Sequence, residues 1–419
     1  MDVPDAIQLM GDKQWQEIKS RLTGKFNKMM KGLFRQKGAQ LDINILASDE
    51  AQEFITTHAG ILDGGFQKVE MSDKMRERLT RSNYIFSGIK TFHELNEAFP
   101  SMLDENGNKK PFERFLNDVQ KINDTYNANY LHAEYNFVQA SATMAAKWEQ
   151  FSEDGDRYYL QYRTAKDDKV RPEHAALDGV TLPMSDSFWE TYYPPNGWNC
   201  RCTVVQVRKQ KYPATEHGEA MSRGEEAMNG ERYNIFRFNS GKQGKTMPDY
   251  NPYTIRRCND CDVAKGKLKL GFVPDYQLCQ GCVMIRKCSE DRNRDNSAKA
   301  TKKSPEVKKL QGTTIFNPDF KHEVLISGSS IKEWTNQPHK DYAAKNSILK
   351  HIAKVFREAN YIGAVDNFKQ KPGVIQSHLF ETTVLGDVSW IVIREYDDGR
   401  FILHSLSDGD RIKTGIRKE

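Results

Sequence analysis

The segment from Arg163 to Val207 constrains the fold more than any other part of this 419-residue chain. It reads RTAKDDKVRPEHAALDGVTLPMSDSFWETYYPPNGWNCRCTVVQV, and loop-forming residues are frequent in it. A Pro-Pro-Asn-Gly turn at 194–197 leads into Cys200 and Cys202, and the apolar run that follows is typical of a strand. Ordinary scaffold rarely needs so many special residues so close together, so the segment predicts a site or a family signature.

The order of these residues resembles the phage Mu F-like minor head protein family, also called head morphogenesis proteins. The shared pattern begins with Arg-Thr-Ala, continues with Val-Arg-Pro-Glu-His and Leu-Asp-Gly, and ends with the Pro-rich turn before Cys-Arg-Cys. The resemblance covers roughly the first half of the chain. It implies a virion component of a tailed phage or prophage, incorporated in few copies near the portal during head assembly. The signature positions that it marks are Arg171, His174, Asp178, Cys200 and Cys202.

That resemblance implies portal and capsid proteins as partners, and a location inside the phage head after assembly in the host cytoplasm. The composition describes a soluble protein, since 38% of the residues are hydrophobic and 28% are charged. No apolar run reaches the length of a membrane-spanning helix, and the amino terminus lacks the basic-then-apolar layout of a secretory signal. We therefore expect synthesis in a cytoplasm and no membrane partner. The net charge of +5 is too small to indicate nucleic-acid binding by itself.

Hydrophobic spacing and composition predict an α+β multidomain protein. Before Phe151, apolar residues recur at three- and four-residue intervals, which is typical of amphipathic helices. Near the C-terminal end, a helical pattern precedes three β-branched and aromatic runs, which predicts a helix followed by an antiparallel sheet. Between these regions lies a charged stretch with almost no large apolar groups, which predicts a flexible linker. The expected parts are a helix-rich head domain at 1–210, a polar connector at 211–255, a small zinc-binding module at 256–288, the linker at 289–312 and a helix-plus-sheet domain at 313–419.

The seven cysteines favour metal binding over disulfides, because a reducing cytoplasm opposes disulfide formation. Cys258 and Cys261 form one Cys-x2-Cys pair, and Cys279 and Cys282 form a second pair after seventeen intervening residues. Two such pairs can hold one tetrahedral ion, so the spacing predicts a structural zinc site with four thiolate ligands. Cys288 could replace one ligand, and separate buried thiols are the alternative.

The signature segment has two interpretations. In one of them, His174, Cys200 and Cys202 form a second metal site, with Asp178 as a fourth ligand. A Cys-x-Cys spacing, however, chelates a metal less well than Cys-x2-Cys. In the other interpretation, the histidine is buried and hydrogen-bonded, and the two thiols simply pack in the interior. The sequence leaves both interpretations open.

The C-terminal domain contains residues that suit a metal-independent ribonuclease. His378 begins one predicted strand, while His404 and Ser405 lie in another, and an antiparallel sheet can bring both imidazoles to one face. Two histidines that titrate near neutrality suit general acid and base catalysis of RNA cleavage. A helix followed by a twisted sheet with these residues resembles the barnase, EndoU, colicin and RelE-like nuclease superfamily. That resemblance implies His378, His404 and Ser405 as catalytic residues.

The same resemblance implies Lys369 or Lys371 as phosphate contacts and Trp390 as a base-stacking residue. RNA is then the expected substrate of a toxin effector, and an immunity protein is a further partner. Each of these residues also has an ordinary structural explanation, because strand histidines, core tryptophans and turn lysines are common. The alternative function is a purely structural virion protein whose C-terminal domain binds the portal or DNA without catalysis.

Overall fold

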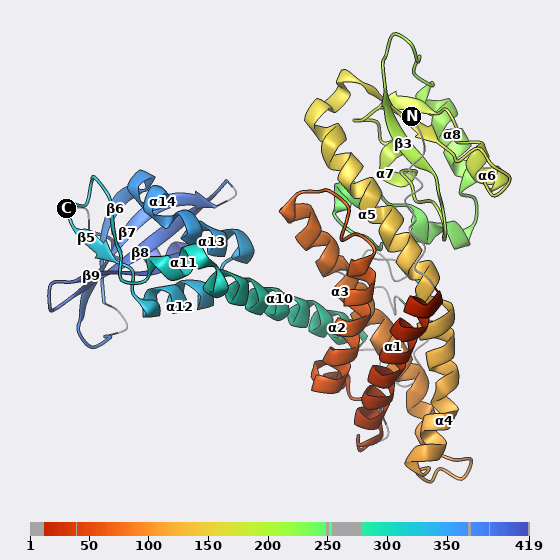
Figure 1. Ribbon diagram of the computed structural model, residues 1–419, viewed down its shortest axis with the longest axis horizontal. Coiled ribbons are helices and arrows are strands. Elements are labelled where there is room, and N and C mark those ends of the chain that lie inside the picture. The colour runs from red at the N-terminus through yellow and green to blue at the C-terminus, as the bar shows by residue number, and fades with distance from the viewer. Residues whose placement is uncertain are drawn as a thin grey trace. The chain divides into compact units, whose positions relative to one another are not determined.

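The chain divides into two compact units, Met1–Ser289 and Glu290–Glu419 (Figure 1). The computed structural model describes residues 12–38, 40–248, 251–253, 278–367, 370–384 and 386–417. Helix α10, Leu278–Lys303, spans the boundary between the units. None of the helices within the described ranges is both long enough and apolar enough to cross a membrane.

Long helices dominate the first unit, as the spacing of its apolar residues predicts. Their buried faces share one hydrophobic core, in which the rings of Phe26 and Phe54 pack edge to face. Ser48 and Ser72 cap the amino ends of α2 and α3 by accepting backbone N–H groups. The helical segments are α1 Asp12–Phe34, η1 Ile43–Ala47, α2 Asp49–Gly64, α3 Asp73–Ala98, η2 Phe99–Met102, α4 Phe112–Asn123 and α5 Leu131–Asp154.

The helical pattern before Phe151 is interrupted in the structure. A π-helical turn, η3 at Asp124–Asn129, separates α4 from α5. This wider turn changes which residues share a face, so Tyr130 is exposed although it continues the apolar spacing of α4. A polar turn separates η2 from α4, and Leu103 and Lys109 form a β-bridge around it.

A small antiparallel sheet follows the long helices and has the strand order β2-β1-β3. The strands are β1 Tyr159–Arg163, β2 Thr181–Pro183 and β3 Thr203–Val207. The predicted strand after the Pro-rich turn is therefore confirmed as β3. The loops between the strands contain the short helices α6 Pro172–Ala175 and α7 Phe188–Thr191, and η4 Gly155–Arg157 precedes β1.

The structure corrects the prediction of a polar connector at 211–255. The described part of this segment folds against the helices, and Phe236, Phe238 and Met247 lie in the same core. Thr246 also donates its hydroxyl to Asn83 of α3. Apolar residues are scattered among polar ones in this segment without a regular period, so no repeating pattern indicated burial. It contains α8 His217–Ala227, η5 Glu231–Phe236 and α9 Ser240–Gln243.

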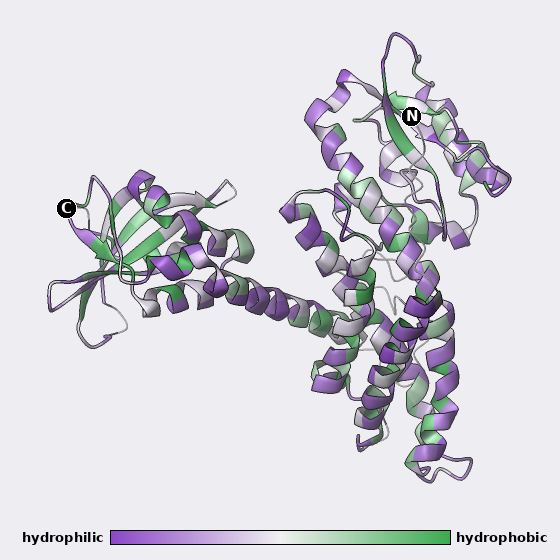
Figure 2. Cartoon of the chain, viewed as in Figure 1, coloured by the Kyte–Doolittle hydropathy of each residue, from purple (hydrophilic) through white to green (hydrophobic). Residues whose placement is uncertain are grey.

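The predicted flexible linker at 289–312 is also wrong, because this segment is helical. Helix α10 continues to Lys303, and α11 Pro305–Leu310 follows it. Alanine, lysine and arginine are good helix formers, so a segment can be charged and helical at once. Figure 2 shows α10 as mostly hydrophilic. Val307 of the following helix α11 is fully buried in the core of the second unit.

The second unit contains a six-stranded sheet in the order β4-β5-β9-β8-β7-β6. Neighbouring strands are antiparallel except for β5 and β9, which are parallel. Asp397-Asp398-Gly399, a sequence typical of hairpin turns, joins β8 to β9, and Tyr396 donates its N–H to the Arg400 oxygen at 2.9 Å. The strands are β4 Thr314–Phe316, β5 Glu323–Leu325, β6 Asn360–Asp366, β7 Val374–Val384, β8 Asp387–Tyr396 and β9 Phe401–Ser407.

The two faces of this sheet have different cores. Strand alternation directs Phe380 and Ile391 toward a core that also contains Trp334 of α12. Leu379 and Val392 point to the opposite face and form a smaller cluster. The single helix predicted here is divided into shorter pieces, namely α12 Gly328–Asn336, α13 Tyr342–Ile348, η7 Leu349–His351 and α14 Ile352–Glu358, with η8 Asp410–Lys413 after β9.

Candidate functional site

Three metal-ligating side chains of the signature segment lie together in the first unit. His174 lies on α6, and Cys200 and Cys202 precede β3. The Nδ1 atom of His174 is 3.6 Å from the Sγ atom of Cys200 and 3.8 Å from that of Cys202. All three residues are buried, and their ligand atoms lie within 4.8 Å of one another. One ion could therefore contact an imidazole and two thiolates at this point.

Local geometry explains how these residues come together. The end of β1 pairs with the start of β3, so Cys202 lies beside the connection that contains α6. Arg171 fixes the Pro-rich turn by donating from Nη2 to the main-chain oxygen of Trp198 at 2.6 Å. A Cβ atom on Gly197 would lie 2.9 Å from Nη1 of Arg171, so glycine permits this close approach. The turn and the signature arginine thus position the cysteines.

Asp178 is not part of this cluster, in contrast to the sequence interpretation that made it a fourth ligand. Its Oδ1 atom accepts hydrogen bonds from the backbone N–H of Thr164 at 2.8 Å and from the hydroxyl of the same residue at 3.1 Å. Its Oδ2 atom lies 3.4 Å from Nζ of Lys166. These contacts hold the connection between β1 and β2. Among the residues described, the cluster therefore offers three protein ligands.

The two thiols of the cluster differ in acidity. A hydrogen bond from Cys202 lowers the pKa of Cys200, and the His174 imidazole lowers it further, although burial opposes both effects. The same hydrogen bond and burial raise the pKa of Cys202. Cys200 is therefore the residue of this pair that more readily supplies a thiolate.

The predicted four-cysteine zinc site falls mostly outside the described residues. This applies to Cys258 and Cys261, and to the side chain of Cys279. Cys282 is buried on α10, and Cys288, on the same helix, packs against a small cluster formed by α2 and α3. The four-cysteine site stays a prediction.

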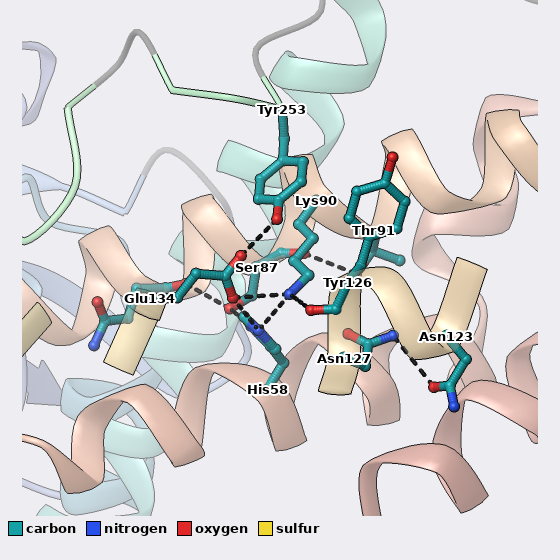
Figure 3. A network of polar contacts seen from close by, with 10 residues as sticks. His58, Ser87, Lys90, Thr91, Asn123, Tyr126, Asn127, Glu134 and Tyr253 are labelled. Atoms are coloured by element: carbon teal, nitrogen blue, oxygen red, sulfur yellow. Dashed lines mark hydrogen bonds and ion pairs between the residues drawn. The ribbon is translucent and has the colours of Figure 1, made fainter. Parts of the chain in front are cut away.

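A second constellation, which sequence reasoning missed, is a polar network buried between α2, α3 and α5. Figure 3 shows the Lys90 ammonium group beside the Glu134 carboxylate and the His58 ring. Nζ of Lys90 is 2.8 Å from Oε2 of Glu134 and 3.1 Å from Nε2 of His58, and it donates to the Tyr126 main-chain oxygen at 2.7 Å. Tyr253 donates its hydroxyl to the other Glu134 oxygen at 2.6 Å.

Burial and the neighbouring charges determine how this network ionises. Although burial opposes it, the Lys90 charge lowers the pKa of Glu134 to about 2, so this carboxyl is ionised. Burial and the same ammonium lower the pKa of His58 to about 4, so its ring is neutral. Burial raises the pKa of Glu94 to about 8, which keeps that side chain protonated at neutral pH. The network is thus a sealed ion pair that links three helices.

His378 of the predicted nuclease site is buried in the second unit. Its Nδ1 atom is 3.0 Å from the Tyr361 hydroxyl, and its Nε2 atom is 2.9 Å from Oε2 of Glu395. The ring of Phe320 covers it at a centroid distance of 4.7 Å. His322 is exposed and stacks on Phe401 at 4.2 Å. The imidazole of His378 therefore contacts a carboxylate and a phenol at the edge of an aromatic cluster.

The structure does not bring His378 and Ser405 to the same face of the sheet. His378 pairs with Ile393 on β8, whereas Ser405 pairs with the adjacent Val392, and neighbouring residues of a strand point to opposite faces. Ser405 is buried on its face. His404 is half-buried at the bulge where the β8–β9 register shifts. The bulge explains why strand alternation alone could not place it.

Two of the three predicted substrate-binding residues lie within the described part of the chain, and they differ in exposure. Trp390 is only 3% exposed, and the Lys413 ammonium lies 4.4 Å from its ring, so it has no face open for base stacking. Lys371 is exposed in the turn before β7. Lys369 lies outside the described residues.

Sequence reasoning also missed Tyr361 and Glu395 as neighbours of His378. Gln376 donates to the same Glu395 oxygen at 2.8 Å. Although partial burial opposes them, the hydrogen bonds from His378 and Gln376 lower the pKa of Glu395. These residues come from different strands, so only the pairing of β6, β7 and β8 could have revealed their proximity.

Comparisons with known proteins give matches in both units. Residues 106–205 match the family described as Phage Mu protein F like protein, and residues 293–403 match Large polyvalent protein-associated domain 3. The chain is 29% identical over 283 residues to the "Putative capsid assembly protein F" of Escherichia phage Mu, which covers 62% of this chain and 61% of the relative. It is 33% identical over 102 residues to the Mu-like prophage FluMu F protein of Haemophilus influenzae, which covers 24% of this chain and 22% of the relative. No solved structure matches the chain significantly.

Proposed function

We propose that this chain is a minor head protein of a tailed phage or prophage and that it acts in capsid assembly near the portal. The observation that supports this most directly is the 29% identity over 283 residues to the phage Mu protein, whose name describes capsid assembly. The family match at 106–205 includes all five signature positions. Portal and capsid proteins are the proposed partners, and the inside of the phage head is the proposed location.

The geometry of the first unit supports a structural role for the signature. Three of its five residues, His174, Cys200 and Cys202, are buried, and Arg171 and Asp178 hold turns. Residues in such positions support the fold and do not present an exposed reactive group. The signature therefore suits a component that offers a defined surface to other virion proteins.

The test is genetic. Deleting the coding sequence from an inducible prophage is expected to reduce infectious particles by orders of magnitude and to leave incomplete or misshapen heads in electron micrographs. Supplying the full chain from a plasmid should restore both, and Arg157→Ala, at an exposed position, should restore them equally well. Normal heads and an unchanged titre after deletion would refute the proposal.

A structural zinc at Cys258, Cys261, Cys279 and Cys282 forms a second part of the proposal, and it is supported by the spacing of the two cysteine pairs. Four protein thiolates complete a tetrahedral shell and leave no open position, so this zinc would stabilise the module at 256–288. We assign it no catalytic role.

A ribonuclease toxin activity of the second unit is the second function that we propose. The observation in its favour is the contact between buried His378 and Glu395, whose side chain is 23% exposed. An imidazole and a carboxylate in contact can act as acid and base on a ribose hydroxyl and its phosphate. RNA as substrate and an immunity protein as partner belong to this proposal. The alternative is that the second unit binds the portal or DNA without catalysis.

Purified full-length chain incubated with cellular RNA in a chelator tests this activity. Glu395→Gln is expected to slow cleavage by about 10²-fold or more, because it removes the proton acceptor but keeps the shape. His351→Ala, at an exposed position on η7, should cleave like the wild type. Intact RNA with the wild-type chain would favour the non-catalytic alternative.

A further inference from the structure

We propose that His174, Cys200 and Cys202 bind a zinc ion in the first unit, separate from the four-cysteine site. Two thiolates and one imidazole are soft and borderline ligands, which select zinc over magnesium or calcium. Two thiolates also neutralise the charge of a divalent ion, so the complex can remain buried. The proposal does not depend on the role in capsid assembly.

The distances between the ligand atoms fit a tetrahedral ion. With Zn–S of about 2.3 Å and Zn–N of about 2.0 to 2.1 Å, nitrogen and sulfur ligands of one tetrahedron lie about 3.6 Å apart. The measured separations between Nδ1 of His174 and the two Sγ atoms are 3.6 and 3.8 Å. A neutral imidazole can donate one hydrogen from Nδ1, so it cannot hydrogen-bond well to both sulfurs at once. A metal ion satisfies both contacts.

The orientation of the ring also favours coordination. Nε2 of His174 is buried and meets no hydrogen-bond partner among the described residues. The contacts of Nδ1 with sulfur are therefore the polar contacts that orient this ring. In addition, the site joins α6 to the start of β3, two segments that are 26 residues apart in the chain at His174 and Cys200. An ion here would tie the Pro-rich turn to the sheet.

The fourth ligand is a water molecule in this proposal. Asp178 is occupied by Thr164 and Lys166, as its contacts show. The hydroxyl of Tyr162 donates to the Asn196 side-chain oxygen at 2.8 Å and also interacts with the Cys202 side chain. Protein zinc ligands are thiolates, imidazoles and carboxylates, so we assign the fourth position to solvent. The site thus has three protein ligands.

The test uses a full-length chain in which Cys200 and Cys202 are the remaining cysteines. Cys258, Cys261 and Cys279 are replaced by serine, and the packed Cys282 and Cys288 by alanine. Cobalt(II) is added as the probe, because cobalt bound to thiolates in a tetrahedral site absorbs strongly in the visible and near-ultraviolet. Circular dichroism confirms that each variant is folded.

We expect this variant to bind one equivalent of cobalt with the absorption of a two-thiolate tetrahedral site, and one equivalent of zinc should displace it. Adding Cys202→Ser should weaken binding at least tenfold and reduce the thiolate absorption by about half, while His174→Ala should weaken binding but keep both thiolate bands. A folded variant that binds no cobalt or zinc overturns the proposal. If the chain bound the metal as expected but was dispensable for head assembly, the proposed function would be refuted and the metal site would stand.

Discussion

The stability of the first unit depends on the buried ion pair between Lys90 and Glu134. Lys90 is fully buried and Glu134 is 2% exposed, so water screens neither charge. Removing two charges from water is costly, and the contacts with His58, Tyr126 and Tyr253 offset that cost. The pair is therefore neutral as a whole, but each half depends on the other.

Lys90→Met is expected to reduce the free energy of unfolding of the first unit by about 3–5 kcal/mol, because it leaves the Glu134 charge buried without a partner. Urea unfolding measures this loss. Arg157→Ala, which breaks an exposed pair, should change stability by no more than about 0.5 kcal/mol. The double variant Lys90→Met/Glu134→Leu should recover most of the loss. Equal stability of Lys90→Met and Arg157→Ala would contradict this account.

Glu94 gives the same unit a pH dependence of known sign. Its pKa is about 8 in the folded chain and 4.5 when unperturbed, so the folded state binds more protons between these values. Stability from this group is complete below about pH 4.5 and is lost as the pH rises toward 8. Glu94→Gln cannot titrate, so its melting temperature should rise relative to the wild type between pH 5 and pH 8. A difference that stays constant over this range would show that Glu94 is ionised in the fold.

At the scale of elements, glycines mark where helices approach closely. A Cβ atom on Gly241 of α9 would lie 2.1 Å from the Cβ atom of Trp148 on α5. Gly60 is exposed within α2, and a Cβ atom there would meet nothing within 4 Å. Gly241 is therefore required for close packing of α9 on α5, whereas no neighbouring group requires a glycine at position 60.

Gly241→Ala should therefore destabilise the first unit by about 1–3 kcal/mol through overpacking. Gly60→Ala should stabilise it by about 0.5–1 kcal/mol, since alanine loses less backbone freedom in a helix. Thermal unfolding of both variants beside the wild type measures the two shifts. Shifts of the same sign would contradict the packing that we describe.

The elements that could be predicted from the sequence are those with a local signal. The Asp397-Asp398-Gly399 turn and the long runs that form β7, β8 and β9 have clear turn and strand patterns. Strands β4 and β5 have three residues each, which is too short for a pattern. No particular residue type marks the π-helical turn before Tyr130. The helix at 289–303 was missed because a charged segment with few large apolar residues is typical of a disordered linker.

The candidate site was predictable to the extent that residue types define chemistry. His174, Cys200 and Cys202 stand out as metal ligands in the sequence, but only the pairing of β1 with β3 shows that they meet. The sequence contains no such signal for Lys90, because a lysine that is buried in a helix cannot be distinguished there from a lysine on the surface. The partners of His378 were missed for a related reason, since Tyr361 and Glu395 lie on neighbouring strands.

At the scale of the whole molecule, each unit has its own hydrophobic core, and the boundary between the units falls within α10. In the second unit, Gly363 has a φ of +132°, and a Cβ atom there would lie 2.3 Å from the Arg417 main-chain oxygen. An alanine at this position is therefore strained. The separate cores predict separate unfolding.

Scanning calorimetry of the full chain should show two transitions. Gly363→Ala is expected to lower the temperature of one of them, and Gly241→Ala that of the other, because each substitution disturbs a different core. If both variants lowered the same single transition, the two units would unfold as one cooperative body.

The proposed role in capsid assembly requires that the chain is built into phage heads. Mass spectrometry of particles purified by density gradient tests it most directly, with the chain quantified against the major capsid protein. We predict that the chain is present in DNA-filled heads at a few copies per particle and that nuclease and high-salt washing do not remove it. Its absence from washed, infectious particles would contradict the account.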